Sequence, residues 1–254
     1  MGKDKLRRFK ENKSFPNVFE PLTSQIFGCD YYLKGRWNTD VFHNDNPIVL
    51  ELGCGKGEYT VELARRNPHI NYIGIDIKGA RLWRGAKLSN EEHLPNVAFL
   101  RTHIEFLLGA FSRDEVSEIW ITFPDPQLKT KRAKKRLTSP LFLEMYSKFL
   151  KKDGFINLKT DSAHLYGYTL FLAQSYSLEV DVKNEDIYGS EFADETLSVK
   201  TAYEKVYLSK GLPIRYLRFS LGMRESFERL EWEEDKKLLS QKDDEKERED
   251  IRRH

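Results

Sequence analysis

An α/β fold built on a doubly wound, mostly parallel sheet is predicted by three features of the sequence. Beyond residue 46, short apolar or β-branched runs alternate with segments whose apolar residues recur at helical spacing, a pattern typical of βαβ units. A glycine-rich turn joins the first of these strands to the first helix. Two of the last expected strands are separated by only a few residues, which indicates an antiparallel pair at one edge of the sheet.

The individual elements follow from these patterns in chain order. The expected strands of the parallel part are residues 47–52, 71–76, 97–101, 118–123 and 154–160. Segments with helical spacing are residues 59–67, 80–93, 104–111, 139–152 and 162–175, with Ser139 as the N-cap of the fourth helix. Residues 178–186, 202–211 and 214–221 are rich in β-forming side chains and are expected to finish the sheet.

The chain of 254 residues, 39% of them hydrophobic, is long enough for one domain with appendages. Residues 1–45 form an irregular, basic and aromatic lead-in, residues 46–222 the α/β domain, and residues 223–254 a segment with 12 acidic and 9 basic residues. We expect a surface helix in the first half of this last segment, with contacts through Phe227, Leu230 and Trp232. The remainder is expected to be a solvated tail.

Composition argues against several classes of protein. The formal net charge is only +2, so any binding of nucleic acid has to come from local clustering of cations. Two cysteines, Cys29 and Cys54, are too few for a disulfide framework, and no Cys/His cluster has metal-ligand spacing. The charged start predicts no signal peptide, and no apolar run is long enough to span a membrane. We therefore expect a cytoplasmic protein without a metal or a membrane partner, either monomeric or homodimeric.

The glycine turn, "LELGCGKGEYT", carries Gly53, Gly55 and Gly57. Glycines let the backbone turn sharply and let a ligand approach closely. The spacing differs from the dinucleotide pattern G-x-G-x-x-G, because the third glycine comes one residue early and Glu58 follows it. Glu51 adds a second acid before the turn, which suits a cationic ligand better than a pyrophosphate. S-adenosylmethionine, with its sulfonium and ammonium groups, fits this pattern better than NAD.

Asp76 ends the second strand, about 20 residues after the glycine turn, where an acid can accept both ribose hydroxyls of a nucleoside. This feature does not separate NAD from S-adenosylmethionine, since both contain adenosine. A plainer interpretation is a glycine turn with a helix-capping acid in an ordinary α/β protein.

The stretch "ITFPDPQLKTKRAKKRL" leaves the strand at residues 118–123, which the usual doubly wound order places beside the first strand. The flanking prolines restrict the backbone of Asp125, which suits a carboxylate that positions a substrate. Six of the eight residues from Lys129 to Arg136 are basic. Such a cluster can bind the phosphates of a nucleic acid, through Lys129, Lys131, Arg132, Lys134 and Lys135.

Other functions remain open on this reasoning. The basic run alone also matches a solvated loop or an import-like signal. A nucleotide-dependent oxidoreductase would carry G-x-G-x-x-G and a catalytic Tyr-Lys pair or His, and neither is clear. A non-catalytic, RNA-binding Rossmann-like protein would explain the cations but not the acids around the glycine turn. A methyltransferase that acts on protein or small molecules would not need the cations, whereas one that acts on another RNA would.

These motifs together resemble the bacterial tRNA (guanine-N7-)-methyltransferase family. The matching stretches are "ELGCGKG", "GID" ending at Asp76, "FPDP" followed by "KTKRAKKRL", "KTD" at 159–161 and "TAYE" at 201–204. The resemblance implies a class I methyltransferase fold, Rossmann-like with a seven-stranded sheet, and S-adenosyl-L-methionine as methyl donor. It also implies tRNA as substrate, with the guanine at position 46 of the variable loop as target.

By this resemblance, Glu51 and Asp76 bind the cofactor and Asp125 lies between cofactor and guanine, while Lys129, Asp161, Thr201 and Glu204 contact the substrate. The sequence departs from the family at two positions. His103 stands where the family usually has an Asp that faces adenine, and its ring could hydrogen-bond adenine in place of that Asp. Gln127 stands where the family usually has Trp. A plainer interpretation of Thr201 and Glu204 is the start of an edge strand.

The chemistry of guanine N7 needs no general base, because N7 carries a free lone pair. The protein has to align N7 with the methyl group and exclude water. Methylation leaves positive charge on the guanine, which a fixed carboxylate at Asp125 or Asp161 would attract. The same carboxylate could accept hydrogen bonds from the guanine N1–H and N2 amine.

Overall fold

The computed structural model describes residues 3–235 and contains an eight-stranded sheet in the order β1-β4-β3-β2-β5-β6-β8-β7. The strands are β1 (Val18–Phe19), β2 (Ile48–Leu52), β3 (Asn71–Ile75), β4 (Val97–Leu100), β5 (Val116–Thr122), β6 (Leu150–Thr160), β7 (Glu179–Asn184) and β8 (Arg215–Ser220). Neighbours from β1 to β6 are parallel, and β8 is antiparallel to both β6 and β7. The predicted α/β, mostly parallel fold is confirmed, with β1 as a short addition from the lead-in.

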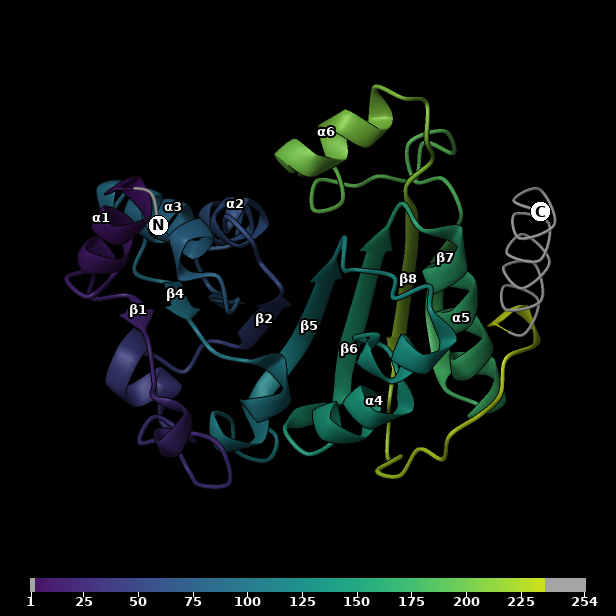
Figure 1. Cartoon of the computed structure of the whole chain (residues 1–254), viewed down its shortest axis with the longest axis horizontal. Coiled ribbons are helices and arrows are strands. Elements are labelled where there is room, and N and C mark those ends of the chain that lie inside the picture. The colour runs from purple at the N-terminus through teal and green to yellow at the C-terminus, as the bar shows by residue number, and fades with distance from the viewer. Residues whose placement is uncertain (1–2, 236–254) are drawn as a thin grey trace, which may run out of the picture.

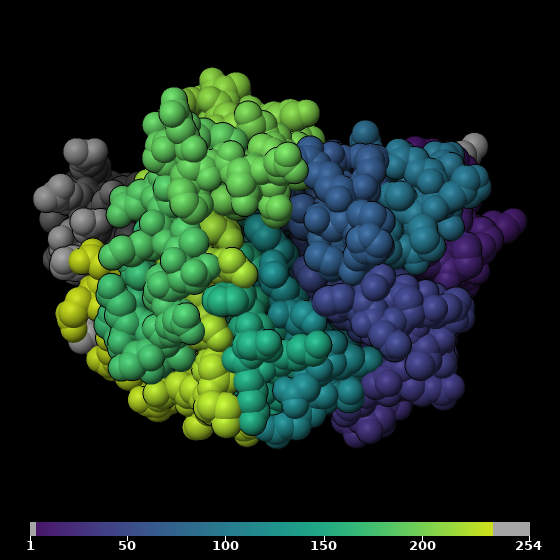
Figure 2. Space-filling model, turned by 180° about the vertical axis from the view of Figure 1, so that it is seen from behind, coloured from purple at the N-terminus to yellow at the C-terminus, as the bar shows by residue number. Residues whose placement is uncertain are grey.

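Helices cover both faces of this sheet (Figure 1). The helices are α1 (Lys3–Asn12), α2 (Glu58–Arg66), α3 (Gly79–Glu91), α4 (Pro140–Tyr146), α5 (Ala163–Ser175) and α6 (Ala202–Leu208). Helices α4 and α5 lie on the face toward the viewer in Figure 1, and Figure 2 shows α2 and α3 on the opposite face beside the chain that precedes α6. This two-sided cover follows from the crossover connections between parallel strands.

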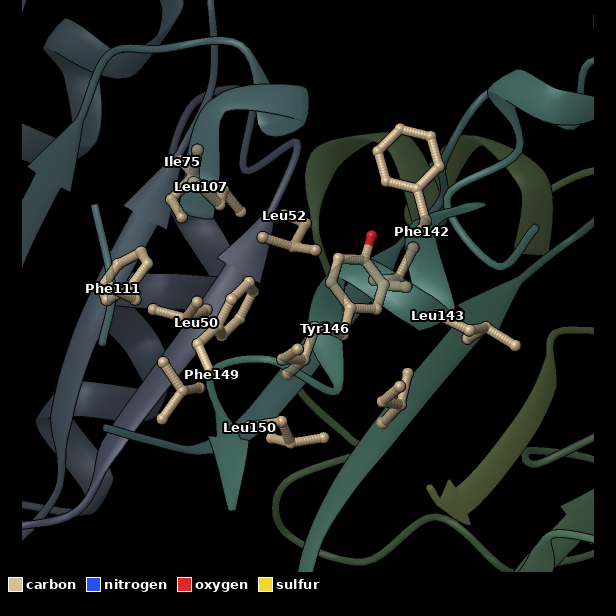
Figure 3. Packing of buried hydrophobic residues seen from close by; sticks show 14 of the residues in the cluster. Leu50, Leu52, Ile75, Leu107, Phe111, Phe142, Leu143, Tyr146, Phe149 and Leu150 are labelled. Carbon is tan, nitrogen blue, oxygen red and sulfur yellow. The ribbon is translucent and has the colours of Figure 1, made fainter. Parts of the chain in front are cut away.

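The strands at the centre of the sheet are buried on both sides because helices cover both faces. Alternate residues of β2 belong to different cores: Leu50 and Leu52 pack with Tyr146 and Phe149 (Figure 3), whereas Val49 packs with Tyr59 of α2 on the other face. The carboxyl ends of β2, β3, β5 and β6 therefore lie along one edge of a rigid scaffold.

The predicted strand at 202–211 is wrong, because these residues form α6 instead. Thr201 explains the helix: its side chain accepts a hydrogen bond from the backbone N–H of Glu204 at 3.1 Å, which is an N-cap. The antiparallel pair at the sheet edge is present, but it joins β8 to β7. The helix expected at 139–152 ends at Tyr146, and Leu150 already begins β6. Ser139 is the N-cap residue of α4, yet its hydroxyl donates to the Lys134 carbonyl at 3.1 Å.

The two appendages differ from the expectation in opposite directions: the lead-in is more structured, and the described part of the C-terminal segment is less helical. The lead-in contains α1, β1 and two short non-α helical turns, η1 (Thr23–Gln25) and η2 (Asn38–Phe42), so it is not irregular throughout. Residues 104–109 form a 3-10 helix, η3 (Ile104–Gly109). Residues 224–232 are not helical, although Phe227, Leu230 and Trp232 pack against the core as predicted. Residues 233–235 are helical, whereas the end of the predicted helix at 236–239 and the predicted tail at 240–254 lie outside the described residues.

Candidate active site

The glycine turn follows β2 and opens α2. Gly53 and Gly55 have φ values of 75° and 56°, in the left-handed region that glycine adopts without strain. A Cβ atom at Gly53 would meet nothing within 4 Å, and one at Gly55 would meet only the Gly53 carbonyl at 3.9 Å. Gly57 also has a left-handed φ, of 69°, and in addition a Cβ there would lie 2.6 Å from the Phe99 ring. The first two glycines thus leave open space for a ligand, and the third packs helix against sheet.

Asp76, at the end of β3, faces this turn. One carboxylate oxygen accepts from the Gly55 N–H at 2.9 Å and the other from the Lys78 N–H at 2.7 Å. The side chain is partly exposed, and each carboxylate oxygen has a further lone pair. Asp76 is therefore placed to accept the ribose hydroxyls of a nucleoside cofactor beside the glycine backbone. These residues fit S-adenosylmethionine.

Glu51 links the glycine turn to the neighbouring strand rather than pointing into the open space. Its side chain is 4% exposed; one oxygen accepts from both the N–H and the hydroxyl of Thr60, and the other accepts from Thr122 Oγ1 at 2.7 Å. Burial raises the pKa of Glu51 to about 7, against the lowering effect of these hydrogen bonds. Its oxygens hold α2 and β5 in place, and a direct contact of Glu51 with the cofactor remains a prediction.

The Pro-Asp-Pro loop begins directly after Thr122, beside the glycine turn. Phe123 and Gln127, which bracket the loop, have φ values of 48° and 46°. Such values cost non-glycine residues roughly 1–3 kcal/mol each and concentrate at functional sites. Asp125 is exposed, and its Oδ1 accepts from the Gln127 N–H at 3.0 Å. Gln127, which departs from the family's Trp, is thus fixed through its backbone.

Arg136 anchors this loop by hydrogen bonds to its backbone, a role that the sequence did not reveal. Its guanidinium is 0% exposed and donates to the carbonyls of Pro126 at 3.2 Å and Gln127 at 3.3 Å. It also forms a bidentate ion pair with Asp235 at 2.7 and 2.8 Å. Composition alone cannot distinguish this arginine from the other basic residues of the run. Arg136 is therefore a positioning residue for the loop that carries Asp125.

The other cations of the basic run have no ion-pair partner within the described part of the chain. Residues Thr130–Lys135 form a 3-10 helix, η4, preceded by Lys129. The exposed cations are Lys129, Lys131, Arg132, Lys134 and Lys135, and none of them forms an ion pair with another residue between 3 and 235. Unpaired cations on a surface are suited to phosphate groups.

Thr201 and Glu204, which are expected to contact substrate, fix α6 over the carboxyl edge of the sheet (Figure 1). Glu204 is fully buried and pairs with the buried Lys159 of β6 at 2.8 Å, and it also accepts from the Tyr188 hydroxyl at 2.6 Å. Burial lowers the pKa of Lys159, and Glu204 opposes this shift. Because its carboxylate is buried and paired with Lys159, Glu204 holds α6 in this arrangement, and its predicted contact with the substrate remains a prediction.

Helix α6 also touches the glycine turn. The Ala202 N–H donates to Glu58 Oε2 at 2.8 Å, directly after Gly57. The next residue, Tyr203, is half exposed, and its ring centroid lies 5.6 Å from that of Phe123. Helix α6 therefore connects the cofactor turn to the Pro-Asp-Pro loop.

Tyr203 is a candidate that the sequence reasoning missed. Burial raises its pKa, as do its hydrogen bond with Tyr207 and the negative charges of Asp161 and Asp125. Both carboxylates therefore act on the same exposed ring. The sequence does show an aromatic residue inside the "TAYE" stretch at 201–204. That this side chain is exposed follows only once Thr201 is known to be a helix N-cap.

Asp161 and His103, the two remaining predicted site residues, differ in their relation to the glycine turn and the Asp125 loop. Asp161 follows β6, is partly buried and has a pKa raised by that burial. His103 precedes η3; its exposed ring packs on Phe106 with centroids 5.1 Å apart. Among the described residues, His103 has no hydrogen bond to Asp76 or to the glycine turn. Its predicted contact with adenine remains a prediction.

The glycine turn and Asp76 together form the cofactor cradle. The fold and this cradle define a class I, S-adenosylmethionine-dependent methyltransferase. The fold is similar to that of the 16S rRNA methyltransferase KamB, with a TM-score of 0.54 and 17% identity over 69% of this chain and 87% of that one. It is also similar to a 16S rRNA (adenine(1408)-N(1))-methyltransferase from Catenulisporales acidiphilia with cosubstrate SAM, with a TM-score of 0.51 and 11% identity over 76% of this chain and 91% of that one. At these identities the similarity concerns the fold alone.

Sequence comparison is more specific. Residues 45–217 match the family model described as "Putative methyltransferase". The tRNA (guanine-N(7)-)-methyltransferase of Christiangramia forsetii is 56% identical over 87% of this chain and 99% of its own, and that of Bacteroides thetaiotaomicron is 50% identical over 87% of each. The chain belongs to the tRNA (guanine-N7-)-methyltransferase family.

Two further properties of the described part of the chain bear on partners. None of the helices between residues 3 and 235 has the length and apolar character that crossing a membrane requires. The same residues include no group of three or more His, Cys, Asp or Glu side chains that could hold a metal ion.

Proposed function

We propose that this protein methylates N7 of a guanine in the variable loop of tRNA, at position 46, with S-adenosyl-L-methionine as donor. The observation that carries the proposal is the hydrogen bond of Thr122 to Glu51 at 2.7 Å, because it holds the start of the Asp125 loop against the start of the glycine turn. The names of the relatives support the reaction and the tRNA substrate. A cytoplasmic location fits this substrate.

In this proposal the donor supplies a methyl group on a sulfonium, and a bond from N7 to that methyl forms as the carbon–sulfur bond breaks. Gly53, Gly55 and Asp76 hold the donor. Asp125 and Asp161 accept from the guanine N1–H and N2 amine, and they stabilise the positive charge that develops on the base. No residue has to remove a proton, because N7 attacks through its lone pair. Alignment of the two reactants is the main task of the protein.

Methyl transfer to a mapped nucleotide tests this proposal. With unmodified tRNA and labelled S-adenosylmethionine, we expect incorporation at the variable-loop guanine and none after that guanine is replaced by adenine in the transcript. Incorporation that persists at another nucleotide, or transfer to ribosomal RNA but not tRNA, would instead support the alternative of a methyltransferase for another RNA. Binding of tRNA without any transfer would support a non-catalytic protein.

Tyr203 is assigned to stack on the target base. An unpaired base gains about 1–3 kcal/mol from an aromatic partner, and the gain grows as the base becomes cationic. We expect Tyr203→Leu to lower kcat/KM for tRNA by roughly 5- to 150-fold, as this energy implies, and Tyr203→Phe to stay within about threefold. Val206→Ala is the matched control, since Val206 is equally exposed on α6.

A binding cycle separates stacking from a structural effect of the Tyr203 substitution. Removal of the target base from the tRNA should weaken binding to the unmodified enzyme and to Tyr203→Phe. The same removal should cost Tyr203→Leu clearly less affinity, because the stacking partner is already missing and only the contacts of the base with Asp125 and Asp161 are left to lose. An equal loss in all three proteins would refute the assignment.

A further inference from the structure

A second basic surface lies on the other side of the cofactor turn from the run at 129–135. It is a groove of about 510 Å³ between α1, α3 and the glycine turn. Its lining contains five cations and one acid, namely Arg8, Lys56, Arg81, Arg84, Lys87 and Glu91. In the sheet order, α3 follows β3 and η4 follows β5, so the two basic surfaces flank the carboxyl end of β2.

The groove is built into the fold. Asn12 of α1 donates to the Gly79 carbonyl at 2.9 Å, and Arg8 donates to the Ala80 carbonyl at 3.3 Å. Trp83 of α3 donates to Glu11 at 2.7 Å and has the Arg8 guanidinium 4.9 Å from its ring centroid. Helix α1 is therefore a fixed wall, and the cations on it and on α3 have defined positions.

The charge of this groove is only partly compensated. Arg8, Lys87 and Lys56 have acidic neighbours at 3.5, 3.6 and 4.0 Å. Arg81 and Arg84, one helical turn apart on α3, are exposed and form no ion pair with any residue of the described chain from 3 to 235. The cations of the groove repel one another, and a bound polyanion would relieve this repulsion. S-adenosylmethionine carries one carboxylate, so it cannot account for this number of cations.

We infer that the α1–α3 groove binds the phosphate backbone of the substrate RNA while the target base occupies the active site. Lys56 belongs both to the groove and to the glycine turn, so RNA in the groove lies next to the cofactor cradle. With η4 on the far side, the RNA is held at two places about the reacting base. This inference rests on the proposed function, since the RNA is the substrate of that reaction.

The test compares two pairs of exposed cations that have no ion-pair partner among residues 3–235. Arg81→Gln/Arg84→Gln should lower the affinity for unmodified tRNA roughly tenfold near physiological salt and reduce the slope of log K against log salt by about 2, one for each phosphate contact. Lys151→Gln/Lys152→Gln is the control, because these lysines lie at the opposite end of β6. It should change neither quantity. Affinity for S-adenosylmethionine should be unchanged in both variants.

The outcomes separate the inference from the function on which it rests. If the unmodified enzyme methylates the mapped guanine but both double variants bind tRNA equally well, the groove does not bind RNA. If the unmodified enzyme transfers no methyl group, the proposed function fails whatever the binding data show. Binding to phosphatidylserine vesicles that is lost in Arg81→Gln/Arg84→Gln, with tRNA affinity intact, would assign the groove to a membrane surface and overturn the inference.

Discussion

Asp125→Ala is expected to lower kcat/KM for tRNA by about 100- to 1,000-fold, the range found when a group that stabilises developing charge is removed. The carboxylate is exposed at the tip of a loop whose start is fixed to the glycine turn through Thr122. It therefore has both access to the base and a defined position. Affinity for S-adenosylmethionine, measured by calorimetry, should stay within about threefold, since the cradle is made by the glycine turn and Asp76.

Asp125→Asn distinguishes the charge from the loop geometry. The Asp125 side chain accepts from the Gln127 N–H at 3.0 Å, and an Asn carbonyl can make the same bond. If charge matters, Asp125→Asn should lose most of the activity that Asp125→Ala loses. If Asp125→Asn retains full activity, the carboxylate serves only to shape the loop and the mechanism is wrong. Asp153→Ala, at an exposed acid near the start of β6, is the control for loss of a negative charge.

The framework of the site could be predicted from the sequence because it depends on local patterns. The strands that end at Leu52, Ile75 and Thr122 are short buried runs, and their order follows from βαβ connections. That order by itself predicts that the Asp125 loop lies beside the glycine turn. Asp76 could likewise be assigned from its spacing after the turn.

The parts that the sequence did not predict depend on contacts between distant residues. Residues 202–211 contain the Tyr and Val residues of a strand, and only the cap at Thr201 and the burial of Glu204 against Lys159 make them a helix. Arg136 looks like any cation of its run, and its burial depends on Asp235, 99 residues away. Glu51 was placed correctly at the end of β2, but its hydrogen bonds to Thr60 and Thr122 depend on the packing of α2 and β5.

Glu204→Gln is expected to destabilise the protein by about 3–5 kcal/mol, because it leaves the buried Lys159 ammonium without its counter-charge. Both side chains are fully buried, so solvent cannot replace the lost carboxylate. For a chain of this size, a loss of that order lowers Tm by roughly 6–20 °C. Urea unfolding followed by circular dichroism would measure it, with the midpoint falling at an unchanged slope.

This measurement decides whether Glu204 positions α6 or contacts the substrate. A residue that only touched RNA could be replaced without loss of stability, and its substitution would raise KM for tRNA alone. If Glu204 holds α6, its substitution should instead lower stability. Activity of Glu204→Gln on tRNA should then also fall, as it does in Tyr203→Leu, because α6 carries Tyr203. Asp181→Asn is the control: the Asp181–Arg218 pair at 3.1 Å is solvent-exposed, and its loss should cost less than about 1 kcal/mol. Equal stability of Glu204→Gln and Asp181→Asn would show that the buried pair does not hold the helix, and the assignment of Tyr203 would lose its structural basis.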